Sequence, residues 1–348
     1  MQKISFLLLA CGLQVFSANA QNSGHTPPFL VKSLSGASVR QVNVETTGGN
    51  ISVTGSADAD ARVEVYIWGN NGNEDLSKAE IQKRLDELYE LNITVSNNKL
   101  TAIAKPKEKS MNWKKGLSIS FKVFAPQGSS TTLRTSGGNI RLKDLSGGIQ
   151  DFKTSGGNLD IDQLSGKITG RTSGGNIIVA DSKEDIDLST SGGNIEASNC
   201  NGNIRLSTSG GNLRLRLLQG SIRSSTSGGN VEGEEVKGEL SAHTSGGNVR
   251  LRDLYCSLET STSGGHIEVN MKELGKYLTV TNSSGDIDLE LPQNKGIDLR
   301  VRGSKVKANS LSNFKGETDE EHIDGAMNGG GVPVKVDAGG GRVRLNFK

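Results

Sequence analysis

The sequence predicts an all-β protein built as a parallel β-solenoid, or β-helix. The string Thr-Ser-Gly-Gly-Asn recurs with a period of 18 residues, and an aliphatic residue follows each copy at a fixed distance. Gly accounts for 46 of the 348 residues, whereas hydrophobic residues make up only 33 %. This composition supplies too few apolar side chains for two thick globular cores, but enough for one thin core along a stack of coils.

The repeated string marks one corner in each coil. Its serines are Ser136, Ser155, Ser173, Ser191, Ser209, Ser227 and Ser245, followed by degenerate copies at Ser263 and Ser283. Gly and Asn tolerate left-handed backbone angles, so we expect a tight turn in which at least one glycine has positive φ. Representative corner residues are Ser136, Gly137, Gly138, Asn139, Ser173, Gly174, Gly175, Asn176, Ser209, Gly210, Gly211 and Asn212.

Two strands follow each corner. Counting from the Thr of the string, position 6 is aliphatic in all nine copies: Ile140, Leu159, Ile177, Ile195, Leu213, Val231, Val249, Ile267 and Ile287. Position 8 is mostly apolar and position 7 mostly polar, which predicts a strand with one buried face. Position 15 predicts a second buried strand through Ile149, Ile168, Ile186, Ile204, Ile222, Leu240 and Leu258. The usual crossover preference favours a right-handed coil.

Charges alternate along the outward positions 7 and 9. From one coil to the next they read Arg214 and Arg216, then Glu232 and Glu234, then Arg250 and Arg252. If the coils stack in register, each opposite-charge pair contributes roughly 0.2–1 kcal/mol. With a formal net charge of only +2, the pattern favours a ladder of ion pairs over a basic patch, so no nucleic-acid partner is expected.

The chain divides into five segments. Residues 1–20 have the features of a signal peptide, with Lys3, an apolar run and Ala18-Asn19-Ala20. Lipidation at Cys11 is the less favoured alternative, because the apolar run continues past it. No later apolar run is long enough to span a membrane. The other segments are a leader (21–39), an irregular N-terminal β region and cap (40–131), the regular solenoid (132–291) and degenerate C-terminal coils with a cap (292–348).

The N-terminal region is expected to combine several strands with one helix. Ser77 and Glu80 form a capping-box pattern that predicts a helix near 78–91. The expected strands are Val42–Glu45, Ile51–Thr54, Val63–Trp68, Ile93–Ser96, Leu100–Ala104 and Leu117–Ala125.

No catalytic, cofactor or metal site is expected. The best acidic pair for sugar chemistry, Asp160 and Asp162, lies within the ladder of charges. The histidines are scattered, at His25, His243, His266 and His322, and the corners lack the Asp column of calcium-binding repeats.

The two cysteines after the signal peptide are expected to be free. Cys200 and Cys256 lie three coils apart, too far for a disulfide. We expect Cys200 to be buried, and Cys256 to lie at a turn and be more exposed.

Over residues 36–348 the layout resembles the bacterial putative-adhesin family of uncharacterised exported proteins. The shared features are an export signal, an irregular β-rich start, Ser-Gly-Gly-Asn corners and a glycine-rich end. The resemblance implies a parallel β-helix and defines no catalytic residues.

The prediction is a non-enzymatic protein of the cell envelope, an adhesin or scaffold in the periplasm, on the outer surface or secreted. Its partner would be a surface glycan or another envelope or host protein. The alternative is a carbohydrate-active enzyme, a polysaccharide lyase or glycosidase.

Overall fold

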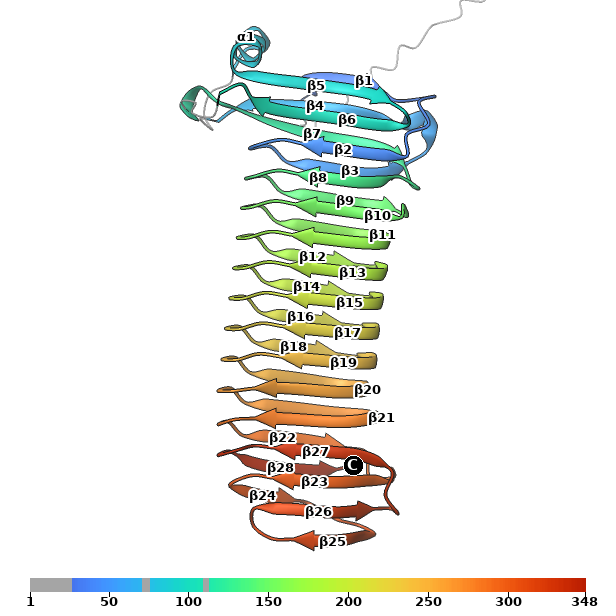
Figure 1. Cartoon of the computed structure of the whole chain (residues 1–348), viewed down its shortest axis with the longest axis vertical. Coiled ribbons are helices and arrows are strands. Elements are labelled where there is room, and N and C mark those ends of the chain that lie inside the picture. The colour runs from blue at the N-terminus through green and yellow to red at the C-terminus, as the bar shows by residue number, and fades with distance from the viewer. Residues whose placement is uncertain (1–26, 71–75, 109–112) are drawn as a thin grey trace, which may run out of the picture.

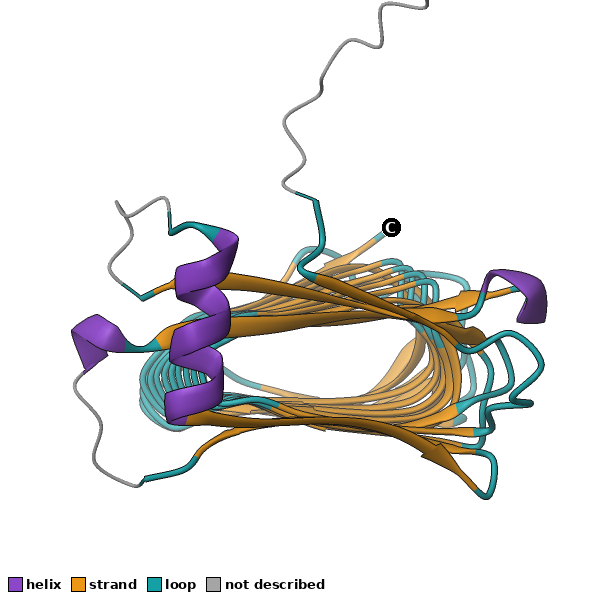
Figure 2. Cartoon of the chain, turned by 90° about the horizontal axis from the view of Figure 1, so that it is seen from above, coloured by secondary structure: helices purple, strands orange, loops and turns teal. Residues whose placement is uncertain are grey.

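The structure is a computed structural model that describes residues 27–70, 76–108 and 113–348. The chain forms one long stack of coils (Figure 1). Seen along the stack, each coil is flattened, and two sheets face each other (Figure 2). Aliphatic side chains from both sheets fill the space between them. The predicted parallel β-solenoid with a single helix is therefore confirmed. The expected signal peptide, Cys11 and His25 lie outside the described residues.

The first sheet contains the strand that follows each corner. Thirteen strands join through twelve parallel pairings, which span about 60 Å at the usual spacing of strands. In spatial order they are β7 (Leu117–Pro126), β3 (Ile51–Ser56), β9 (Ile140–Leu145), β11 (Leu159–Arg171), β12 (Ile177–Ala180), β14 (Ile195–Ser198), β16 (Leu213–Arg216), β18 (Val231–Glu234), β20 (Val249–Thr262), β21 (Ile267–Asn282), β22 (Ile287–Leu291), β28 (Arg342–Phe347) and β24 (Lys305–Ala308).

The second sheet is the parallel stack on the other side of the core. The long strands β11, β20 and β21 continue into it, so their second halves belong here. In spatial order the strands are β6 (Lys99–Pro106), β2 (Gln41–Glu45), β8 (Ser130–Arg134), β10 (Ile149–Lys153), β11, β13 (Lys183–Ser189), β15 (Asn201–Ser207), β17 (Gln219–Ser225), β19 (Lys237–His243), β20, β21, β27 (Val332–Asp337) and β23 (Ile297–Arg302).

The core repeats from coil to coil because the register is strict. Ile195 lies beside Leu213, which lies beside Val231, and all three are fully buried. One position departs from the sequence expectation. Ile149 is 54 % exposed, and Gln150 is buried in its place, pairing with Ile168. The 19-residue spacing of this coil adds one residue before the strand, and a shift of one residue exchanges the two faces. Gln150 is satisfied by Thr131, whose hydroxyl donates to Gln150 Oε1 at 2.7 Å.

Antiparallel strands cover the N-terminal end of the stack. The chain adds β4 (Arg62–Gly69) to β7, β1 (Leu30–Ser33) to β4, and β5 (Tyr89–Ser96) to β6. The 3-10 turns η1 (Asp58–Asp60) and η2 (Trp113–Lys115) and the helix α1 (Lys78–Leu88) complete this end. The Ser77 hydroxyl accepts a hydrogen bond from the Glu80 amide at the helix start. The helix is shorter than predicted, because residues from Tyr89 onward pair with β6.

The coils at both ends are stacked out of sequence order. The first coil, β2 and β3, lies between the later coils β6–β7 and β8–β9. At the other end the last two strands, β27 and β28, lie between β21–β22 and β23–β24 (red strands in Figure 1). Beyond them, β26 (His322–Met327) pairs antiparallel with β23, and β25 (Phe314–Thr318) pairs antiparallel with β26. Among the described residues, no helix has the length and apolar character needed to cross a membrane.

The corners need glycine for a different reason from the one expected. Neither Gly210 nor Gly211 has positive φ. A Cβ on Gly211 would lie 1.9 Å from the carbonyl oxygen of Gly193 in the preceding coil, whereas a Cβ on Gly210 would lie 3.7 Å from the nearest atom. The second glycine is therefore required by the close approach of two backbones. The left-handed residues lie at the opposite turn, for example Asn199 (φ 51°) and Gly202 (φ 125°).

This difference predicts unequal effects of the same substitution at adjacent positions. Gly211→Ala forces two coils apart and should lower the free energy of unfolding by about 3 kcal/mol or more. Gly210→Ala should change it by less than about 0.5 kcal/mol, because its Cβ makes only ordinary van der Waals contacts. Urea denaturation of both variants measures the difference. Equal losses would contradict the assignment of close approach to the second glycine.

Candidate functional site: the face and edge of the first sheet

A ladder of asparagines runs along the corners at the edge of the first sheet. Asn194 Oδ1 accepts a hydrogen bond at 2.8 Å from the backbone amide of Asn212, one coil later. Eight such bonds form in all, one between each coil and the next. The first acceptor is Asn50 Oδ1, and the last donor is the backbone amide of His266. Asn is therefore retained for a bond between coils, since none of these residues has positive φ. The sequence analysis missed this ladder, although the repeated Asn at position 5 was its signal.

A second ladder lies beneath each corner. The hydroxyl of Thr208 donates to the carbonyl of Gly193 in the preceding coil at 2.8 Å and accepts from the amide of Gly211 at 3.3 Å. The threonine is buried, and it joins two coils while closing its own turn. At each such corner, the threonine hydroxyl and the asparagine Oδ1 therefore both bond to a neighbouring coil.

The outward face of the first sheet carries the predicted charges. Arg214 lies between Glu196 (3.0 Å) and Glu232 (3.4 Å), and Arg216 pairs with Glu234 (3.4 Å). All of these side chains are about half exposed, so each pair contributes at most about 1 kcal/mol.

Farther along the same face, both Arg250 (2.9 Å) and Arg252 (3.1 Å) pair with Glu268. Burial opposes ionisation of Glu268, but its hydrogen bonds to the two guanidiniums prevail and lower the pKa of its carboxyl. The six predicted residues also line an open depression of about 270 Å³, with Leu215 and Gly233 at its floor.

An apolar position interrupts the charges. Ile178 is 49 % exposed and lies between Asp160 and Glu196 on the neighbouring strands. With Asn158, Asn176 and the Arg141–Asp160 ion pair it lines a depression of about 380 Å³ at the edge of the sheet. We call this the Ile178 depression. It combines one apolar surface with amide and charged groups, a mixture typical of ligand sites.

Both carboxylates considered for catalysis form ion pairs with basic side chains of the neighbouring strand. Asp160 pairs with Arg141 at 2.8 Å, and Asp162 pairs with Lys143 at 2.9 Å. The hydrogen bond from Lys143 to the Asp162 carboxylate raises the pKa of Lys143. A two-carboxylate mechanism needs both carboxyl groups free to contact the substrate, whereas each of these is bound to a cation. The geometry therefore gives no support to a two-carboxylate mechanism at these residues.

The histidines lie apart from one another. His243 lies between the hydroxyls of Ser241 and Ser261, at 2.8 Å from each. His322 pairs with Asp319 (2.6 Å) in the C-terminal cap. Within the described part of the chain, no group of three His, Cys, Asp or Glu residues could hold a metal ion.

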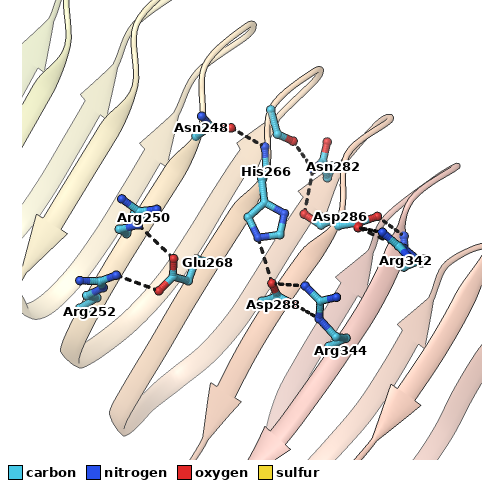
Figure 3. A network of polar contacts seen from close by, with 11 residues as sticks. Asn248, Arg250, Arg252, His266, Glu268, Asn282, Asp286, Asp288, Arg342 and Arg344 are labelled. Carbon is cyan, nitrogen blue, oxygen red and sulfur yellow. Dashed lines mark hydrogen bonds and ion pairs between the residues drawn. The ribbon is translucent and has the colours of Figure 1, made fainter.

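His266 marks the end of the asparagine ladder. Its imidazole replaces the Asn side chain, and Nε2 lies 3.0 Å from Asp288 on the next strand (Figure 3). Asp288 also accepts a hydrogen bond from Arg344, and the Asp286 carboxylate accepts from both the guanidinium and the backbone amide of Arg342. These contacts of Arg342 lower the pKa of Asp286. The network thus attaches the last strand of the chain to the end of the regular solenoid.

Both described cysteines are free and buried. The expectation that Cys256 would be exposed at a turn is wrong, because β20 continues through this position and points the side chain inward at 1 % exposure. Burial raises the pKa of the Cys200 thiol, and it raises that of Cys256 to about 12.

We therefore expect neither thiol to react with a thiolate-selective reagent in the folded protein at pH 8. Both should react in denaturant, and Cys256→Ser leaves Cys200 as a control. The pKa of Cys256 is higher in the folded chain, so its contribution to stability is present below pH 9 and is lost as the pH rises toward 12. Rapid native labelling of Cys256 would contradict its buried position.

Comparison with known proteins places the later part of the chain near one family. Residues 177–346 match the family described as Toastrack DUF4097, a stretch just under half of the chain. It begins at β12 and ends within the last strand, β28. No curated protein matches the chain.

Two solved structures are similar to the chain. A putative cell adhesion protein from Clostridium sporogenes is 13 % identical, with 92 % of this chain and 98 % of the other covered and a TM-score of 0.19. A putative adhesin from Bacteroides fragilis is 12 % identical, with coverage of 92 % and 96 % and a TM-score of 0.24. At these TM-scores the backbones do not share one superposition, so the functions named for these proteins carry no weight for this one.

Proposed function

We propose that the protein is a non-enzymatic, exported protein of the cell envelope that acts as an adhesin or scaffold. The observation that carries the proposal is the first sheet itself, a face about 60 Å long whose charges are largely paired along the stack. Such a face presents the same chemical groups at regular intervals on a rigid backbone. It suits contact with an extended partner better than capture of one small molecule.

The partner that this face fits best is a surface glycan. Sugar rings offer an apolar C–H surface surrounded by hydroxyls. In the Ile178 depression, an exposed isoleucine is surrounded by amides and by the Arg141–Asp160 ion pair. Another envelope or host protein is the second candidate, because the ladder of paired charges offers complementary contacts to a polar protein surface.

The proposal is tested with the purified chain on a panel of surface glycans. We expect binding to an extended glycan without release of cleavage products. Ile178→Ala should weaken binding several-fold, because it removes the apolar contact. Ile149→Ala, an equally exposed isoleucine on the other sheet, should have no effect.

One outcome would contradict the proposed non-enzymatic function, and another would contradict a glycan as the partner. Cleavage of a bound glycan that is lost in Asp160→Asn would show a carbohydrate-active enzyme. Absence of binding to every glycan, together with capture of an envelope or host protein, would assign the face to a protein partner.

A further inference from the structure

The last two strands occupy a position prepared by earlier parts of the chain. We call β27 and β28 the C-terminal strand pair, and the space between the coils β21–β22 and β23–β24 the slot. In the slot, Val334 of β27 lies between Leu278 and Leu299, and Val343 of β28 lies between Ile287 and Val306. The pair is hydrogen-bonded on both edges.

The residues before the strand pair form a hinge. Asn328, Gly329, Gly330 and Gly331 all have positive φ, of 51°, 87°, 80° and 148°. Three consecutive glycines reach these angles without steric cost and can adopt many others. The side-chain amide of Asn328 fixes the start of the hinge, because its Nδ2 donates hydrogen bonds to the carbonyls of Gln293 and Lys295. The chain beyond this point can therefore take another direction while the cap stays in place.

The slot recognises this segment by charge and by shape. Asp286, Asp288 and Glu290 on β22 bind Arg342, Arg344 and Lys348 of the segment (Figure 3 shows the first two pairs). The Arg342–Asp286 pair is 2.7 Å long and the Lys348–Glu290 pair 2.5 Å. On the opposite face of the pair, the buried side chains are Val334, Val336, Val343, Leu345 and Phe347.

We propose that the slot is an interaction surface for a second copy of this chain. Two copies exchange their C-terminal strand pairs, so that each slot is filled by the partner's segment. Every hydrogen bond, ion pair and buried contact in the slot is kept, because the segment is identical, and only the hinge changes its path. Main-chain bonds supply the affinity, and the three acidic residues select a segment with matching bases. The second copy is the occupant because its C-terminal segment carries these bases at the required spacing.

The experiment uses two full-length variants with opposite changes. In the acceptor variant, Asp286→Lys and Asp288→Lys make the slot basic. In the donor variant, Arg342→Glu and Arg344→Glu make the segment acidic. Each variant alone has like charges in its own slot, but an exchanged heterodimer has opposite charges in both slots. The variants carry different tags and are unfolded, mixed in equal amounts and refolded, and mass and composition are measured by native mass spectrometry.

We expect a 1:1 heterodimer whose melting temperature exceeds that of either variant refolded alone by several degrees. The result does not depend on either variant folding alone, since the readout is the mixed species. A single chain with all four substitutions restores the opposite charges of slot and segment, and should refold to the same oligomeric state as the wild-type chain with a nearly wild-type melting temperature. A matched control mixes Arg214→Glu with Glu232→Arg, in ladder coils that cannot be exchanged, and should yield no heterodimer.

The proposal is overturned if the mixture contains no 1:1 species and melts as the sum of its two components. It is equally overturned if the Arg214→Glu and Glu232→Arg mixture also forms heterodimers, because association would then come from surface charge and not from the slot.

Discussion

The close stacking of backbone on backbone at the corners is the constraint on which the rest of the structure depends. The second glycine of each corner lies against the carbonyl of the glycine one coil earlier, at a distance that excludes any Cβ. Around this contact, the threonine hydroxyl and the asparagine side chain each bond to a neighbouring coil. Together they fix the rise and register of the stack. Strict register in turn brings the aliphatic positions together in the core and the charged positions together on the face.

A solenoid held by such ladders has a weakness at its ends, where a coil has no further coil to pair with. Unpaired strand edges invite association with other chains. The two ends of the stack are closed in the same way. At each end one coil is stacked out of sequence order, and antiparallel strands pair with the outermost coil. Because the out-of-order coils pair on both edges, segments distant in sequence are joined. The C-terminal out-of-order strands are held by backbone pairing on both edges and by ion pairs, and they are connected to the cap through a glycine-rich turn.

Much of this architecture could be predicted from the sequence, because the repeat period and the aliphatic columns follow directly from in-register stacking. Predictions from local turn preferences failed where a residue is needed for a contact with another coil. Gly211 and Asn212 were predicted from turn preferences, but Gly211 is needed for its close contact with the preceding coil, and the Asn212 side chain accepts a hydrogen bond from the following coil. Cys256 was placed at a turn because glycine is common at that position, yet here the strand continues.

The stacking order at the ends was also beyond the sequence. Nothing in residues 342–347 indicates that they pair with β22 and β24 simultaneously, since the two partners precede them by different distances. On the outward face of the first sheet, the ion pairs could be predicted from the alternating charges in the sequence. The Ile178 depression was not, because it depends on side chains from four coils meeting at one edge.

Hydrogen exchange at single-residue resolution tests the central claim most directly. In an ordinary exposed turn, backbone amides exchange almost as fast as in an unfolded chain. Here the amides of Ser209, Gly210, Gly211 and Asn212 all donate to acceptors at 2.8–3.3 Å, three of them in the preceding coil. We predict that these corner amides are protected as strongly as those of the adjacent strand, Leu213–Arg216. Corner amides that exchange at unprotected rates while the strand stays protected would contradict it.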